Sequence, residues 1–251
     1  MEGPWPESCT GAVSLTFDDG LDSQLNVAVK ILEKHGLHAT FYLNPWGDHW
    51  RERLAPWAAV ARRGHELGNH STMHPCSKAY DDVTPDRALE RLDLPAIAAD
   101  IDLAEKRLAE LSATSERSFA YPCFQDYVGI GAGRKSYVPV VAQRFLAART
   151  QGQQANHPSR CDFHHLWSWP SERLNAATLV GYCELAADAG SWCIFTFHGV
   201  HEGHLPVADV DLDQLCAHLH RHRNRLWVAP VIEVARRIRQ WRSHTTGEDS
   251  C

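Results

Sequence analysis

The sequence predicts an α/β fold in which parallel strands alternate with helices, as a (β/α) barrel or as an open doubly wound sheet. Three observations lead to this prediction. Short apolar runs alternate with helix-like segments along most of the 251 residues, which favours parallel pairing with helical crossovers. No glycine-rich dinucleotide fingerprint follows the first run, which weakens the nucleotide-binding version of the fold. Polar clusters follow several expected strands, where barrels carry their reactive residues.

The expected strands are short runs of apolar and β-prone residues, as is typical of buried strands. Most are separated from the next by a helical pattern, in the order that βαβ units require. The runs cover residues 12–17, 38–43, 66–70, 118–121, 147–150, 166–169, 192–198 and 226–228.

The expected helices lie between these strands, where apolar residues recur three and four positions apart. The first has Asp22 or Ser23 as its cap and Gly36 at its end. Pro95 lies within the helical segment 84–112 and predicts a break or kink there. Further helices are expected over residues 50–63, 138–147 and 175–189 and from Asp211 and Pro230 onward, whereas residues 122–136 and 151–165 are expected to be loops.

Neither an internal repeat nor a low-complexity linker divides the chain, so one domain is expected. Residues 1–10 form a lead-in, residues 11–242 form the barrel, and residues 243–251 carry no pattern and are expected to be a disordered tail.

The composition excludes two classes of partner. The chain has 25 basic and 31 acidic residues and no basic stretch interleaved with aromatic residues, so nucleic acid is not an expected partner. No run approaches the ~20 apolar residues that a membrane span needs, so no membrane partner is expected. The sequence gives no indication of the oligomeric state.

The N-terminus and the cysteines together predict a cytoplasmic protein. The first six residues have neither the basic start nor the apolar stretch of a signal peptide, although a secreted protein shortened at this end would look the same. Eight cysteines occur, none in a Cys-x-x-Cys pair, and most lie in apolar runs. Such usage suits a reducing compartment.

Two carboxylates stand side by side at the end of the first strand, in Thr16-Phe17-Asp18-Asp19-Gly20. A turn is one interpretation, because Asp-Gly is ordinary turn chemistry and Asp18 could cap the next helix. A site is the other, because carboxylates at a strand end are unfavourable unless they are paired, hydrogen-bonded or bound to a cation.

The segment from His70 to His74 places two imidazoles four residues apart, on one face if the segment is a helical turn. With a carboxylate from another strand end, the pair makes a His₂Asp set with open positions. This is the catalytic zinc pattern, and it also matches the facial triad of non-haem iron oxygenases. The second aspartate favours hydrolysis, which needs a base to deprotonate a water.

His198 ends another apolar strand and could give a proton to a leaving amine or alkoxide. A satisfied core histidine is the alternative.

These segments resemble the polysaccharide deacetylases of the NodB-homology type, carbohydrate esterase family 4. The resemblance runs from about residue 11 to residue 240 and rests on the motifs at residues 16–20, 70–74 and 121–122 and on the strand that ends at His198. It implies a distorted, incomplete (β/α) barrel of about seven parallel strands.

The resemblance also implies a role for each residue of the motifs. Asp18 is the general base, and Asp19, His70 and His74 bind one divalent metal ion, usually zinc. His198 is the general acid. The backbone N–H of Cys123 stabilises the oxyanion, after the Tyr121-Pro122 segment that carries the third motif.

The chain departs from the family in three places. Ala120 stands where the family commonly has an arginine that orients the base, and we hypothesise that Arg149 replaces it. Asp162 and Trp167 lie in the region of the family's fourth motif but at the wrong spacing. Gly199 follows His198, so no neighbour in the sequence tunes the acid.

Cys76 and Cys123 each follow a proline beside a motif, so they could face each other near the metal. We interpret them as packing residues rather than as a redox pair or as ligands.

The sequence thus predicts a metal-dependent hydrolase that removes an acyl group, an N-acetyl group above all, from a sugar or a related amide. An allantoinase-like or imidase-like hydrolase of a small cyclic amide is the alternative, and a non-catalytic carbohydrate-binding barrel is a third interpretation. Trp46, Trp167 and Trp169 are candidates for stacking on a sugar.

Overall fold

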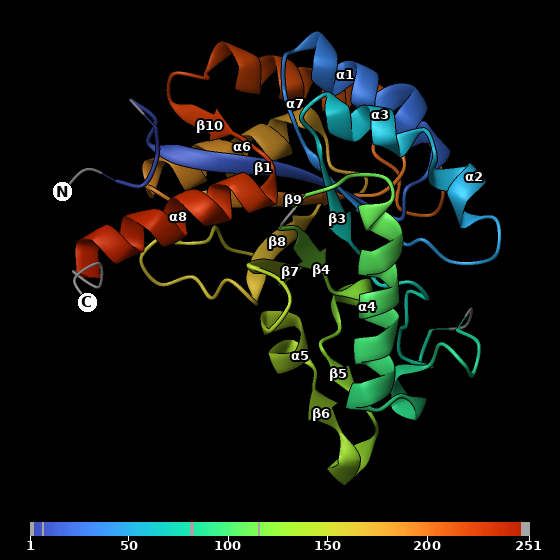
Figure 1. The fold of residues 1–251 in the computed structure, drawn as a ribbon. Helices are drawn as coiled ribbons and strands as arrows, with labels where there is room; N and C mark the ends of the chain where they lie inside the picture. The colour runs from blue at the N-terminus through green and yellow to red at the C-terminus, as the bar shows by residue number, and fades with distance from the viewer. Residues whose placement is uncertain (1–2, 7, 81–82, 115, 247–251) are drawn as a thin grey trace.

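Seven parallel strands form a closed ring at the centre of the part of the chain that the structure describes (Figure 1). The computed structural model describes residues 3–6, 8–80, 83–114 and 116–246. The ring contains β1 (Gly11–Asp18), β2 (Thr40–Leu43), β3 (Glu66–Asn69), β4 (Ser118–Ala120), β7 (Ala147–Gln151), β8 (Leu166–Pro170) and β9 (Trp192–Phe197). Because β9 pairs again with β1, the expected α/β barrel of about seven strands is confirmed, and its ring is closed rather than incomplete.

Strand β1 is the most extensively paired strand of the ring. β9 runs along residues 12–17 on one edge. The other edge is divided between β10 (Leu226–Val228), which pairs with residues 11–13, and β2, which pairs with residues 16–18. The seam between β3 and β4 is narrower, with one registered pair, Asn69 with Phe119. Outside the ring, β5 (Tyr127–Val128) and β6 (Lys135–Ser136) form a small antiparallel hairpin.

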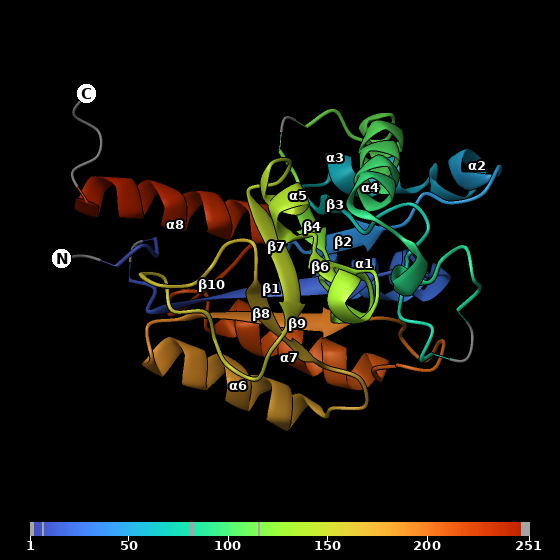
Figure 2. The ribbon, with the colours of Figure 1, turned by 90° about the horizontal axis from the view of Figure 1, so that it is seen from below.

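Helices cover the outside of the ring (Figure 2). α6 lies against β1 and β9 and packs on α7, whereas α4 and α5 pack together against the side of β3 and β7. The helices are α1 (Val29–Lys34), α2 (Trp50–Leu54), α3 (Trp57–Arg62), α4 (Leu94–Ala109), α5 (Val138–Ala142), α6 (Ala176–Asp188), α7 (Asp209–Arg221) and α8 (Val231–Thr246), with short helical turns at Gln24–Ala28, Leu89–Arg91, Pro122–Phe124 and Gly131–Gly133.

The break expected near Pro95 is present, because a short turn at Leu89–Arg91 ends before α4 begins at Leu94. Pro95 lies in the first turn of α4, where Asp93 caps the helix by accepting a hydrogen bond from the backbone of Ala96, and proline is well tolerated there. The expected start of the C-terminal tail was wrong: α8 continues to Thr246, so residues 243–246 are helical. Residues 247–251 lie outside the described residues.

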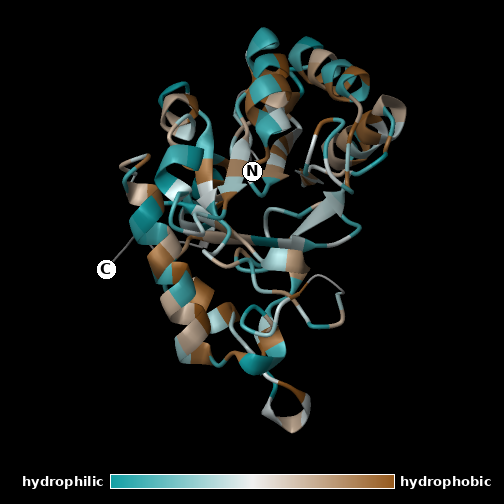
Figure 3. Ribbon diagram, turned by 90° about the vertical axis from the view of Figure 1, so that its right-hand side faces the viewer, coloured by the Kyte–Doolittle hydropathy of each residue, from teal (hydrophilic) through white to brown (hydrophobic). Residues whose placement is uncertain are grey.

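The helices carry both apolar and polar residues, which Figure 3 shows as brown and teal segments of the helix ribbons. Near the carboxyl ends of β1, β2 and β9, the ring of Phe17 stacks on Phe41 and on Phe197, with centroids 5.1 and 5.2 Å apart. These three side chains belong to the apolar core cluster between the ring and its helices. Because side chains alternate along a strand, Asp18, next to Phe17, points into the barrel.

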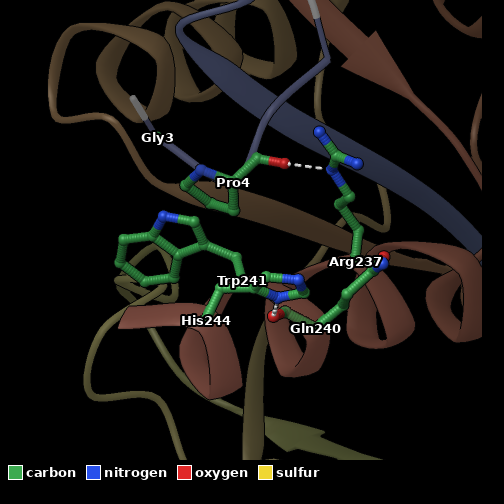
Figure 4. A pocket seen from close by; sticks show the side chains of 6 residues that line it. All are labelled: Gly3, Pro4, Arg237, Gln240, Trp241 and His244. Atoms are coloured by element: carbon green, nitrogen blue, oxygen red, sulfur yellow. Dashed lines mark hydrogen bonds between the residues drawn. The ribbon is translucent and has the colours of Figure 1, made fainter. Parts of the chain in front are cut away.

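The N-terminal segment is tied to the last helix. Nε of Arg237 donates a hydrogen bond to the carbonyl of Pro4 at 2.7 Å, beside a cavity lined by Gln240, Trp241 and His244 (Figure 4). Among the described residues, no helix has both the length and the apolar character needed to cross a membrane.

Candidate functional site

Asp18 forms a buried ion pair with Arg149. Arg149 lies on β7 and is fully buried, and its Nη2 donates to both carboxylate oxygens of Asp18, at 2.5 and 2.6 Å. Nη1 of the same guanidinium donates to the hydroxyl of Thr196 at 2.7 Å. The contact that our hypothesis for Arg149 required is therefore present in the structure.

The pKa of Asp18 reflects two opposing effects. Burial by itself raises the pKa of this carboxyl, but the positive charge of Arg149, with smaller contributions from the neighbouring His70 and His198 and from the hydrogen bonds of Arg149, outweighs burial and holds the pKa below its usual value. Asp18 is therefore ionised at neutral pH, although it is only 3 % exposed.

Asp19 faces two imidazoles across a short gap. Its Oδ1 lies 3.8 Å from Nε2 of His70 and 3.4 Å from Nε2 of His74. The backbone at Asp19 has a φ of 78°, and Gly20 follows with a φ of 66°, so the chain turns sharply as β1 ends. Asp18, as the last residue of β1, points into the barrel, whereas the turn directs Asp19 toward the histidines.

His70 and His74 both present their Nε2 atoms to Asp19. Nδ1 of His70 donates to the carbonyl of Ala120 at 2.8 Å, which leaves its Nε2 lone pair facing Asp19. Burial, and then the neighbouring His70, lower the pKa of His74 well below its usual value. Ligand atoms of Asp19, His70 and His74 all lie within 4.8 Å of one another, and a carboxylate with two neutral imidazoles is a common donor set for catalytic zinc. These residues therefore fit a divalent ion.

The segment that carries the two histidines is not the helical turn that we expected. Ser71 and His74 have positive φ angles of 59° and 51°, and side chains hold the loop in place of helical hydrogen bonds. The carboxylate of Asp100, on α4, accepts from the backbone N–H groups of Thr72 and Met73, each at 3.1 Å. The sequence analysis did not identify Asp100, because nothing in the pattern of α4 connects it with this loop.

Cys76 and Cys123 form a disulfide, with Cα atoms 5.8 Å apart. Our interpretation of the pair as packing residues was therefore wrong. Cys123 has a φ of 51° within the turn Pro122–Phe124, and this left-handed backbone brings its side chain to Cys76. The expectation that the two cysteines could face each other near the metal ligands is confirmed, although they are 47 residues apart in the chain.

These residues surround one pocket of about 210 Å³. His198 lines it, and its buried Nδ1 has no hydrogen-bond partner among the described residues. His204 and Leu205, in the loop that follows β9, line it as well. The lining is Asp18, Asp19, His70, His74, Cys76, Tyr80, Val83, Arg87, Tyr121, Cys123, Phe124, His198, His204 and Leu205.

A second cavity, of about 410 Å³, adjoins this pocket and shares His74 and Arg87 with it. Trp46 lines this cavity and is 60 % exposed, and Met73 and Leu103 are partly exposed beside it. The shared residues make the two cavities neighbouring parts of one groove. The sequence analysis named Trp46 but did not identify Arg87.

Two expected site residues lie elsewhere. Asp162 and Trp167 line a separate cavity of about 350 Å³ that shares no residue with the pocket. Trp169 is also not a sugar platform, because it is 9 % exposed and stacks on Tyr182. Tyr121 lines the pocket, whereas Pro122 is buried beside it. Asp162 and Trp167 lie apart from the pocket because the segment between β7 and β8 returns to the start of β9, where Asn156 pairs with Trp192.

Comparison with known proteins agrees with this geometry. A family model described as polysaccharide deacetylase matches residues 7–126, just under half of the chain. The predicted resemblance to the polysaccharide deacetylases is thus confirmed.

Curated relatives match over shorter stretches. A chitin disaccharide deacetylase from Vibrio alginolyticus is 32% identical over 87 residues, which is 32% of this chain and 20% of that protein. A peptidoglycan-N-acetylglucosamine deacetylase from Bacillus cereus is 37% identical over 78 residues, 30% of this chain and 26% of that protein. The chain thus spans about a fifth and about a quarter of the length of these two relatives.

Solved structures share the fold over almost the whole chain. The peptidoglycan deacetylase PdaC from Bacillus subtilis superposes with a TM-score of 0.59 at 16% identity, covering 98% of this chain and all of that one. A family 4 carbohydrate esterase from Streptomyces lividans, in complex with acetate, gives a TM-score of 0.57 at 16% identity over 88% of this chain and 92% of that one. At such identities the superpositions show the fold alone.

Proposed function

We propose that this chain is a metal-dependent hydrolase that removes an acetyl group from the amide nitrogen of an N-acetylated sugar. One observation carries the proposal: an ionised carboxylate, Asp18, stands beside a separate set of three ligand atoms within one pocket. The similarity to polysaccharide deacetylases over residues 7–126 supports the same reaction class.

Asp19, His70 and His74 would hold the ion, and zinc is the metal that their donor set favours. When bound, it would polarise the acyl carbonyl and make a water acidic enough to attack near neutral pH.

Asp18 serves as the general base in this proposal. The bidentate contact with Arg149 fixes the orientation of the carboxylate and keeps it charged. A base that stays ionised at neutral pH can accept the proton of the attacking water.

The remaining two roles concern the developing charges. The backbone N–H of Cys123, at the pocket wall, would donate to the oxyanion. His198 would give a proton to the departing amine, since an amide nitrogen leaves as an amine only after protonation. Gln24 positions His198 by donating to its carbonyl at 3.1 Å.

The neighbouring cavity favours a substrate longer than one sugar. An exposed indole beside a polar pocket is a typical platform for a sugar face, and Trp46 provides one on the side of His74. A small cyclic amide would leave this part of the groove unused. The cytoplasmic location stays a prediction, and so does the alternative of a small cyclic amide as substrate. Assays of acetate release from N-acetylated oligosaccharides and of ring opening in cyclic amides distinguish the two substrate classes.

The direct test is the variant Asp18→Asn, assayed for acetate release and for bound metal. We expect it to retain the ion, because Asp18 is not among the ligands, and to lose nearly all turnover. Asp162→Asn is the matched control, since Asp162 lines the separate cavity, and it should keep both. Turnover at the wild-type rate in Asp18→Asn would overturn the mechanism, and removal of metal with a chelator should abolish acetate release until zinc is restored.

A further inference from the structure

The disulfide lies directly beside the proposed metal ligands. Cys76 follows His74 by two residues, and both Cys76 and Cys123 line the pocket. The backbone of Cys76 is anchored on the segment 87–89, because its N–H donates to the carbonyl of Arg87 at 3.2 Å and its carbonyl accepts from the N–H of Leu89 at 3.0 Å. These contacts hold the backbone of Cys76 independently of the bond to Cys123.

The ring of His74 stands between two groups of donor atoms. Its Nε2 faces Asp19 at 3.4 Å, whereas its Nδ1 lies 3.5 Å from Sγ of Cys76. Ligand atoms of His74, Cys76 and Cys123 all lie within 4.8 Å of one another, the same limit that Asp19, His70 and His74 satisfy. Among the described residues, these are the two groups of three that could share an ion.

The two groups differ in chemistry. Asp19, His70 and His74 offer one oxygen and two nitrogens, whereas the second group offers two sulfurs and one nitrogen. Thiolates with an imidazole are a preferred set for zinc and other soft cations. In the disulfide the sulfurs are bonded to each other and carry no thiolate, so the second group cannot bind an ion in that state.

We propose that reduction of the Cys76–Cys123 disulfide opens a second metal site, formed by the two thiolates and Nδ1 of His74, for a soft divalent cation such as zinc. Two molecules of a small thiol supply the electrons: the Cys76–Cys123 bond breaks, each cysteine gains a proton, and the small thiols leave joined as their own disulfide. When the cation binds, each cysteine releases that proton to water.

The two sites compete for one histidine. A neutral imidazole has a single nitrogen lone pair, so a cation bound at Nδ1 of His74 leaves Nε2 protonated. Asp19 and His70 then lose their third partner. Reduction in the presence of zinc therefore weakens the first site and should lower the rate of acetate release. This effect on turnover rests on the proposed function, whereas the existence of the second site does not.

Cobalt(II) is the probe for the test, because thiolate ligation gives it an intense near-ultraviolet charge-transfer absorption that oxygen and nitrogen ligands do not give. The full chain with His70→Ala is titrated with cobalt before and after reduction by a water-soluble phosphine, which does not bind the ion as a thiol would. His70→Ala removes a ligand of the first site and none of the second. We expect the thiolate absorption after reduction and none before it.

Two variants in the same background complete the test. Cys76→Ser should abolish the absorption, and so should Cys123→Ser, which covers the case in which either variant folds poorly. Cys161→Ser, which removes a half-buried thiol outside the pocket, should leave it unchanged. Absence of the absorption in the reduced protein, or its survival in Cys76→Ser, would overturn the second site. A separate assay measures whether zinc abolishes acetate release from the reduced wild-type protein. If the deacetylase proposal fails, the cobalt result can still be interpreted, because it does not depend on turnover.

Discussion

Replacement of Arg149 by methionine removes the charge that balances the buried carboxylate of Asp18. Arg149 is fully buried and makes two hydrogen bonds to this carboxylate, so solvent cannot replace the lost partner. Breaking a buried ion pair by removing one member destabilises a protein by about 3–5 kcal/mol, since the other charge is left uncompensated. We therefore expect Arg149→Met to lose about 3–5 kcal/mol of unfolding free energy at pH 7.

The pH dependence gives this prediction its sign. In the wild type the pKa of Asp18 lies below its usual value. The ionised carboxylate therefore stabilises the fold fully at pH values above the usual pKa, and this stabilisation is lost as the pH falls through the lowered pKa. In Arg149→Met the effect of burial is no longer outweighed by the guanidinium, and the pKa of Asp18 rises. The difference in unfolding free energy between the wild type and the variant is therefore largest at neutral pH and decreases on acidification.

Urea unfolding followed by tryptophan fluorescence at several pH values measures this gap, and the acidic limb of acetate release against pH should move to higher pH in the variant. Arg117→Met is the matched control, because Arg117 is also buried but pairs with Glu105, whose side chain is 40 % exposed and can be solvated. It should lose less stability and keep the wild-type pH profile. A loss below about 1 kcal/mol in Arg149→Met, or a gap that does not change with pH, would refute the reasoning.

Two further predictions concern the surroundings of the pocket. Asp100→Ala removes the acceptor for the N–H groups of Thr72 and Met73 and should weaken zinc binding about 10- to 100-fold in a chelator competition, whereas Asp102→Ala, on the same helix but in an exposed pair with Arg144, should not. Trp46→Ala should raise KM for long N-acetylated oligosaccharides about two- to tenfold, as loss of one stacking contact implies, and should leave a disaccharide unaffected; equal effects on both lengths would contradict the role of the groove.

Sequence reasoning was most successful where residues follow strands directly. Side chains at the carboxyl ends of neighbouring parallel strands must meet at one end of a barrel, so Asp18, Asp19, His70 and His198 could be brought together from the strand pattern alone. The structure places all four in the lining of one pocket.

Reasoning from sequence failed where loops decide the geometry. The disulfide depends on the left-handed backbone at Cys123, a conformation that a non-glycine residue rarely adopts and that no local pattern predicts. The positions of Asp162 and Trp167 depend on a crossover without a helix, whose course has no periodicity. Asp100 accepts hydrogen bonds from the loop between His70 and His74 because α4 packs beside that loop. The residues next to Asp100 in the sequence give no sign of this contact.

The position of Arg149 explains how the chain dispenses with an arginine at residue 120. Ala120 on β4 and Arg149 on β7 are register partners in the sheet, and side chains at paired positions of parallel strands project from the same face. The guanidinium of Arg149 therefore reaches a place inside the barrel next to the one that an arginine side chain at residue 120 would reach. Ala120 is fully buried and small, which leaves room for the longer side chain. Arg149 therefore supports Asp18 from the strand next to Ala120 and from the same face of the sheet, which agrees with the hypothesis that it takes the role expected of an arginine at residue 120.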